Sequence, residues 1–85
     1  MNKATIIDVR TPAEFRGGNV SGSINIPLQE IQQRINEIKS LPQPILLCCA
    51  SGGRSGQATA FLKSIGINCE NGGGWMDVNY KYQNA

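Results

Sequence analysis

The sequence predicts an α/β fold, a small parallel sheet flanked by helices on both faces. Short apolar runs alternate with stretches of helical periodicity, which is typical of parallel strands joined by crossover helices. Residues 45–48 form a continuous apolar run, as expected for a central parallel strand that is covered on both faces. The chain has 85 residues, so we expect residues 1–85 to form a single domain.

The N-terminal part predicts one strand and one short helix. Residues 5–9 predict the strand. Thr11 then suits the N-cap of a helix, with Pro12 in the first helical position and Glu14 placed to close a capping box. Glycines at residues 17–18 are expected to end this helix.

A second strand and a longer helix are expected next. Residues 23–26 predict a short strand that Pro27 stops. Beyond it, apolar residues recur at helical spacing and predict an amphipathic helix over about residues 28–39. These apolar residues are Leu28, Ile31, Ile35 and Ile38.

The C-terminal half predicts a tight loop, a helix and a last strand. The loop covers residues 50–53, and the amphipathic helix after it ends at Gly66. Residues 67–70 predict the strand and residues 72–74 a flexible turn, and the polar tail after Val78 is expected to fray. The buried face of the helix is expected to hold Ala58, Phe61, Leu62 and Ile65.

Charge and hydropathy narrow the classes of partner. The formal net charge is only +2, and no run of Lys or Arg occurs, so we expect neither nucleic acid nor a membrane as partner. The apolar run at Ile6 and Ile7 is too short for a signal-peptide core, and no stretch is long enough to span a bilayer. We therefore expect a cytoplasmic protein, or a periplasmic one if the chain is a processed mature form. The lack of an evident exposed apolar stripe favours a monomer.

Three cysteines and the lack of histidine restrict the chemistry. Cys48 and Cys49 are adjacent and Cys69 is alone, which is a poor disulfide framework and a poor zinc site. With no histidine, Cys-His and Ser-His-Asp pairings are excluded. A reactive thiol would therefore need activation by something other than an imidazole.

Cys49 is the candidate reactive residue, because ligands of open α/β sheets bind beyond the carboxyl ends of the strands. Gly52 and Gly53 allow the following loop to curl, so that successive N–H groups point at one place. The next helix begins near Arg54, and its N-terminus adds a positive field. We expect this loop to make the Cys49 sulfur anionic and accessible near neutral pH.

Nearby polar residues fit the same interpretation. Arg54 would suit an oxyanion, and Ser51 and Ser55 supply hydroxyl donors. The structural alternative is that Cys48 and Cys49 merely finish a buried strand, and that the glycines only make a turn. The residues alone leave both interpretations open.

Four segments, in order, resemble the rhodanese family. Residues 49–55, Cys-Ala-Ser-Gly-Gly-Arg-Ser, resemble its active-site loop, and residues 8–15 resemble its N-terminal signature. Residues 22–28 and 71–75 resemble its Gly-Ala-Ile-Asn-Ile-Pro segment and its late glycine turn. The resemblance covers about residues 6–75 and is greatest to small stand-alone members of the phage-shock-protein-E and thiosulfate-sulfurtransferase kind. It implies a rhodanese-like fold for the whole domain.

The resemblance also implies an activity. Cys49 would be the nucleophile that takes a sulfane sulfur from thiosulfate or a polysulfide or persulfide donor. The resulting persulfide would pass the sulfur to cyanide or a thiol acceptor, in two covalent steps. No metal or organic cofactor is implied. The residues implied in binding the small anionic donor are Ala50, Ser51, Gly52, Gly53, Arg54 and Ser55.

Some positions depart from the family pattern, and other functions stay open. Asn19 stands where many members have histidine, and Ala50 where some have arginine, which would weaken thiosulfate binding. The domain could instead be a non-enzymatic sulfur carrier that relays a persulfide between proteins. Counted from Cys48, the spacing to Arg54 is that of phosphatase loops, so a phosphatase or arsenate reductase is a third alternative.

The remaining polar and aromatic residues are expected to be structural. Neighbouring side chains of a strand alternate in direction, so Cys48 should point into the protein, and Cys69 is expected in the core or an edge strand. Asp8 and Arg10 are expected to form an ion pair or a turn anchor near the site. Trp75 is expected to pack at the edge of the core.

Overall fold

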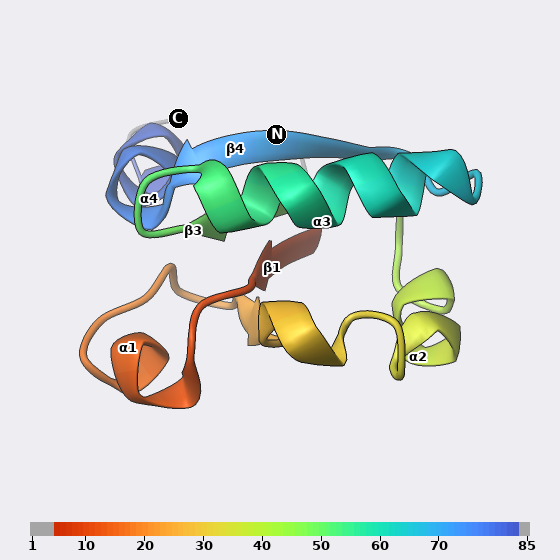
Figure 1. Cartoon of the computed structure of the whole chain (residues 1–85). Coiled ribbons are helices and arrows are strands. Elements are labelled where there is room, and N and C mark those ends of the chain that lie inside the picture. The colour runs from red at the N-terminus through yellow and green to blue at the C-terminus, as the bar shows by residue number, and fades with distance from the viewer. Residues whose placement is uncertain (1–4, 84–85) are drawn as a thin grey trace.

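The computed structural model describes residues 5–83, which contain a parallel sheet of four strands (Figure 1). The strands are β1 (Thr5–Asp8), β2 (Ile24–Asn25), β3 (Ile45–Cys49) and β4 (Cys69–Gly74). Their order across the sheet is β2-β1-β3-β4, and each neighbouring pair is parallel. This confirms the predicted α/β class and places β3 in the interior of the sheet.

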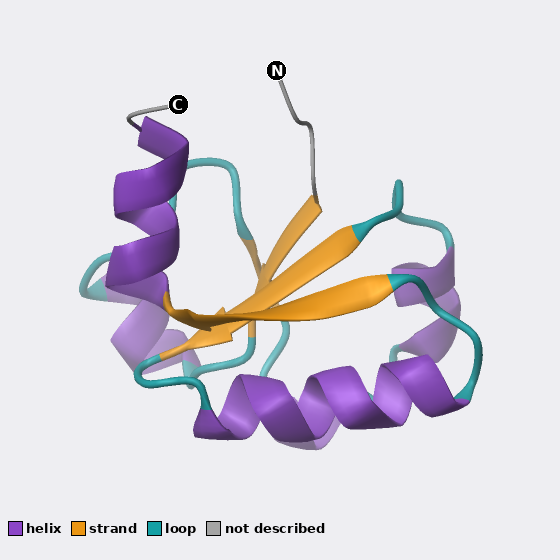
Figure 2. Ribbon diagram, turned by 90° about the horizontal axis from the view of Figure 1, so that it is seen from above, coloured by secondary structure: helices purple, strands orange, loops and turns teal. Residues whose placement is uncertain are grey.

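Helices cover both faces of the sheet, as expected. In chain order they are α1 (Pro12–Arg16), the 3₁₀ helix η1 (Leu28–Glu30), α2 (Ile35–Lys39), α3 (Gly53–Ser64) and α4 (Trp75–Gln83). Figure 2 shows α3 and α4 on opposite sides of the strands. The loop of residues 50–52 joins the carboxyl end of β3 to the first turn of α3.

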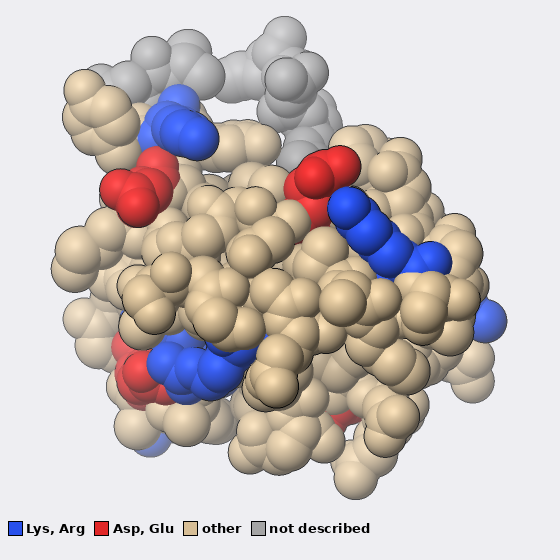
Figure 3. Space-filling model, turned by 45° about the horizontal axis from the view of Figure 1, so that its top comes forward, with Lys and Arg blue, Asp and Glu red and all other residues tan. Residues whose placement is uncertain are grey.

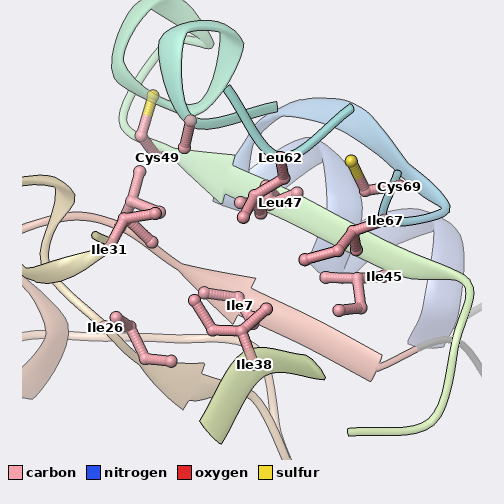
Figure 4. Packing of buried hydrophobic residues seen from close by; sticks show 12 residues of the cluster. Ile7, Ile26, Ile31, Ile38, Ile45, Leu47, Cys49, Leu62, Ile67 and Cys69 are labelled. Carbon is pink, nitrogen blue, oxygen red and sulfur yellow. The ribbon is translucent and has the colours of Figure 1, made fainter. Parts of the chain in front are cut away.

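The core has two parts because side chains alternate along each strand. Figure 4 shows one part, in which Ile45 and Leu47 of β3 pack with Leu62 of α3 and with Ile31 and Ile38 from the segments between β2 and β3. The other part is smaller and lies on the opposite face. It contains Ile6, Val20, Cys48 and Val78, with Leu46, Trp75 and Tyr82 packed against them.

The predicted caps are confirmed at both helices for which the sequence suggested them. In α1, the Glu14 N–H donates to Thr11 Oγ1 at 3.2 Å and the Thr11 N–H donates to Glu14 Oε1 at 2.9 Å, which is a capping box. At the end of α3, Gly66 has a φ of 88°, in the left-handed region that glycine adopts without strain. These caps fix where each helix starts or stops.

The prediction of one helix over residues 28–39 was wrong. The structure has η1, a turn and then α2, and Arg34 leaves helical geometry with φ −108° and ψ 26°. The spacing of the apolar residues fits successive 3₁₀ and α turns as well as one continuous helix, because both bring residues three apart onto one side. Neither segment has a side-chain hydrogen bond at its N-cap.

The expectations for the C-terminal segment were also partly wrong. Residues 72–74 belong to β4 and are not a flexible turn, because they continue the pairing with Cys48 and Cys49. The residues after Val78 continue as α4 up to Gln83 and are not frayed. Ile65 is 39% exposed, although it was expected on the buried face of α3.

Candidate functional site

The loop after β3 directs hydrogen-bond donors at the sulfur of Cys49. The Gly52 N–H donates to Cys49 Sγ at 3.0 Å, and the Ser55 N–H and hydroxyl both donate to it at 3.4 Å. Gly52 has a φ of 105°, which bends the chain back over the sulfur and which other residues rarely adopt. The loop therefore has the cradle shape that its glycines suggested.

These donors lower the pKa of the Cys49 thiol to about 7. Burial raises this pKa, but the Ser55 hydroxyl and the N–H groups of Ser55, Gly52 and Ser51 lower it by more. The thiolate is the nucleophilic form of cysteine. A substantial fraction of this thiol is therefore ionised at neutral pH without any histidine.

The sulfur is less accessible than the sequence analysis expected. Cys49 is only 1% exposed, and its sulfur points toward the loop and the helix that follow β3 (Figure 4). By contrast, Ala50, Ser51 and Gly53 are exposed. The neighbouring residues therefore cover almost all of Cys49.

Asn71 of β4 holds the loop from the side, a role that sequence reasoning missed. Its Oδ1 accepts from the Gly73 N–H at 3.0 Å and lies 2.7 Å from the Ser55 hydroxyl oxygen, so it shares the single hydroxyl proton with Cys49 Sγ. Its Nδ2 donates to the Gly52 carbonyl at 3.1 Å. The pairing register between β3 and β4 shifts at this point, since Leu47 lies opposite Asn71 and Cys48 opposite Gly73. The sequence signal that could have indicated this role is an asparagine directly before three glycines.

Arg54 lies next to the cradle, but its guanidinium is bound by a carboxylate. Its Nη1 and Nη2 donate to Glu14 Oε1 and Oε2 at 2.8 and 3.0 Å. Glu14 was expected only as the capping-box partner of Thr11, which it is. The contact with Arg54 spans 40 positions of sequence, so no local pattern could have predicted it.

Cys48 and Cys69 lie where the sequence analysis expected them. Cys48 is fully buried on the opposite face from Cys49, and burial together with the nearby Asp8 carboxylate raises the pKa of its thiol to about 12. Cys69 lies in the core, where burial raises the pKa of its thiol. Neither thiol is activated.

Asp8 and Arg10 form the expected ion pair, and it is buried. Arg10 Nη2 lies 2.7 Å from Asp8 Oδ2 and also donates to the Gly18 carbonyl at 2.7 Å. The guanidinium lies over the Trp75 ring, 4.8 Å from its centroid. Because both charges are satisfied inside this cluster, it supports the carboxyl end of β1 and offers no free cation.

The surroundings of the loop show neither a cavity lined by it nor a charged patch on the face drawn in Figure 3. A cavity of about 360 Å³ lies between η1 and α3, but its lining includes no residue of the 49–55 loop. On the face seen in Figure 3, basic and acidic side chains lie beside one another and form no patch of one sign. Within residues 5–83, no helix has the length and apolar character needed to cross a membrane.

Comparison with known proteins gives consistent results. The rhodanese-like domain family matches residues 1–80. The chain is 38% identical to thiosulfate sulfurtransferase PspE of Escherichia coli (strain K12) over 74 residues, which cover 85% of this chain and 71% of PspE. It is 47% identical to the uncharacterized protein YqhL of Bacillus subtilis (strain 168) over 64 residues, which cover 75% of this chain but only half of YqhL.

A solved structure agrees with these relatives. A rhodanese with anions from E. coli superposes with a TM-score of 0.78 at 36% sequence identity, covering 88% of this chain and 91% of that one. The fold, the order of the motifs and the relatives all point to one conclusion. The chain belongs to the rhodanese-like family, which contains thiosulfate sulfurtransferases.

Proposed function

We propose that this protein is a sulfurtransferase that carries the transferred sulfur as a persulfide on Cys49. The observation that carries the proposal is the convergence of the Gly52 and Ser55 donors on the Cys49 sulfur. The same donors that favour a thiolate would favour the anionic outer sulfur of a persulfide, in the manner of an oxyanion hole. The thiosulfate sulfurtransferase relative makes thiosulfate the first donor to test.

The first half-reaction forms one sulfur–sulfur bond and breaks another. The Cys49 thiolate attacks the outer sulfur of thiosulfate, and sulfite leaves with the electron pair of the broken bond. A persulfide donor reacts in the same way and releases its own thiolate. In the second half-reaction cyanide or a thiolate acceptor attacks the outer sulfur of the Cys49 persulfide, and the Cys49 thiolate leaves.

The loop residues take separate roles in this scheme. The N–H groups of Gly52 and Ser55 and the Ser55 hydroxyl stabilise the reacting sulfur, while Ala50, Ser51 and Gly53 supply the exposed backbone at the mouth of the loop. Arg54 is the basic residue nearest to Cys49 in the sequence. Binding of an oxyanion by Arg54 requires competition with Glu14, which already occupies two of its N–H groups.

Intact-protein mass spectrometry after mixing with thiosulfate tests the proposal. We expect a gain of one sulfur atom that peptide mapping assigns to Cys49, and its loss when cyanide is added. The Cys49→Ser variant should take up no sulfur, while Cys48→Ser should take it up as the wild type does. Sulfur mapped to Cys48 or Cys69 would contradict the proposal.

The same experiment addresses the alternative functions. A sulfur carrier would load Cys49 slowly from free thiosulfate and quickly from a protein persulfide. The burial of Cys49 is the observation that favours this alternative. A phosphatase working through Cys48 would hydrolyse an aryl phosphate in the Cys49→Ser variant. The position of Cys48 on the opposite face of the sheet, with its raised pKa, argues against that activity.

A further inference from the structure

Arg54, which Glu14 binds, lies close enough to Cys49 for the thiolate charge to be one of the causes that raise the pKa of Arg54. Arg54 precedes Ser55, whose N–H and hydroxyl both contact Cys49 Sγ. The Arg54 and Glu14 side chains are each 36% exposed, so a molecule that approaches the loop from solvent meets both of them. It therefore meets a cation and an anion whose charges cancel.

Glu14 is fixed in this position by more than Arg54. The Thr11 N–H and hydroxyl donate to Glu14 Oε1 at 2.9 and 3.1 Å, and the capping box ties the carboxylate to the start of α1. The hydrogen bonds from Arg54 and from the Thr11 backbone lower the pKa of Glu14 to about 2. The carboxylate is therefore ionised at neutral pH and held against the guanidinium from two sides.

Arg10 cannot take the place of Arg54 at this end of the sheet. Arg10, which follows β1, is 4% exposed and paired with Asp8. Thiosulfate brings two negative charges and a sulfonate group that needs donors. Because Glu14 cancels the charge of Arg54, thiosulfate meets no net positive charge there, and it would have to displace a bidentate contact to bind Arg54 fully.

We propose that Glu14 is a specificity-determining residue that disfavours dianionic donors such as thiosulfate and leaves organic persulfides as the preferred sulfur source. An organic persulfide presents its outer sulfur without a sulfonate, so it needs no clamp from Arg54. Its reaction is balanced: the Cys49 thiolate bonds to the outer sulfur, and the organic thiolate leaves with the electron pair. This inference rests on the proposed sulfur transfer and names the donor class for it.

Glu14→Gln is the direct test, because glutamine keeps the size of the side chain and an oxygen that can close the capping box. The measurement is the second-order rate constant for loading sulfur on Cys49, by rapid quenching and intact-protein mass spectrometry. Thiosulfate and cysteine persulfide serve as the two donors. We expect the substitution to raise the thiosulfate constant about tenfold, as for removal of one partly exposed like charge, and to change the persulfide constant less than about twofold.

Two further variants make the test specific. Glu37→Gln removes a surface carboxylate that also pairs with an arginine, Arg34 of the η1–α2 segment, and should leave the ratio of the two constants unchanged. Arg54→Ala should lower thiosulfate loading less than about threefold in the wild type, and about tenfold in the Glu14→Gln background. The difference between the two losses measures how strongly Glu14 prevents Arg54 from binding thiosulfate.

The outcomes separate the two proposals. If both donors load Cys49 but Glu14→Gln leaves the ratio of constants unchanged or lowers it, the donor preference is overturned and the sulfur transfer stands. Equal losses of thiosulfate loading on Arg54→Ala in the wild type and in the Glu14→Gln background would show that Glu14 does not withhold Arg54, and would also overturn the preference. If neither donor loads Cys49 in the wild type, both proposals fall.

Discussion

Cys48 and Cys49 are neighbours at the end of β3, and they are 0% and 1% exposed, but they lie on opposite faces of the sheet. The pKa of Cys48 is raised to about 12, while that of Cys49 is lowered to about 7. Burial opposes ionisation of both thiols. The loop donors around Cys49 reverse the effect of burial, and the apolar packing and the Asp8 carboxylate around Cys48 do not.

The comparison shows that exposure is a poor guide to the ionisation of a thiol in this fold. On the Cys49 face the last residue of β3 is followed by a loop that supplies N–H groups, which a strand would have used in its ladder. On the Cys48 face the same strand packs against α4 and Val20. The activating feature is thus a set of oriented backbone dipoles, available to one sulfur only.

The largest effect that would test this comparison is the pH dependence of stability. The folded pKa of Cys49, about 7, lies below its unfolded value of 9.0, so the thiolate contributes stability that is present above pH 9 and lost as pH falls through 7. The free energy of unfolding of the wild type minus that of Cys49→Ser should rise by about 2 kcal/mol from pH 7 to 9. Urea denaturation in reducing buffer measures it.

Cys48→Ser is the matched control for that series. Because the folded pKa of Cys48 lies above its unfolded value, its contribution is present below pH 9 and lost as pH rises toward 12. The free energy of unfolding of the wild type minus that of Cys48→Ser should therefore fall by less than about 1 kcal/mol between pH 7 and 9. If the difference in unfolding free energy changed equally with pH for Cys49→Ser and Cys48→Ser, the two faces of the sheet would not differ as described.

An effect of similar size is expected from Gly72→Ala, which tests packing on the Cys48 face. A Cβ at this position would lie 2.8 Å from Val78 Cγ2 and 3.0 Å from Leu46 Cγ, closer than such atoms approach. We expect a loss of about 2 kcal/mol in unfolding free energy by urea denaturation. Gly53→Ala meets no atom within 4 Å and should cost nothing measurable, so similar losses for both would contradict this account.

The smallest effect concerns the Ser55 hydroxyl. Ser55→Ala removes one donor to Cys49 Sγ and leaves the backbone donors, so the pKa of Cys49 should rise by about one unit. The pH dependence of alkylation by iodoacetamide reports this pKa. Ser64→Ala, at the other end of α3, is the control and should leave the profile unchanged. An unshifted profile in Ser55→Ala would assign the lowered pKa to the backbone alone.

The sequence predicted those features that arise from local rules. The capping box of α1, the apolar strand β3, the glycine after α3 and the opposite directions of Cys48 and Cys49 all follow from residues within a few positions of one another. The rhodanese-like fold and family followed from the order of four motifs and are confirmed. The roles of the loop residues remain predictions.

The features that were missed depend on contacts between distant segments. Glycine disfavours strands in general, so only pairing with β3 explains why residues 72–74 form part of β4. The spacing of Trp75, Val78 and Tyr82 was a signal for α4 that the polar composition of the tail hid. The second partner of Glu14 had no signal in the sequence.

Asn71 has a consequence for protein engineering. It joins the edge strand β4 to both the Gly52 carbonyl and the Ser55 hydroxyl, so the heptapeptide 49–55 is held in part from outside itself. Transplanting that heptapeptide into another α/β scaffold would leave the Ser55 hydroxyl and the Gly52 carbonyl without their Asn71 partner. A working graft has to carry the Asn71–Gly73 segment and its shifted register with it.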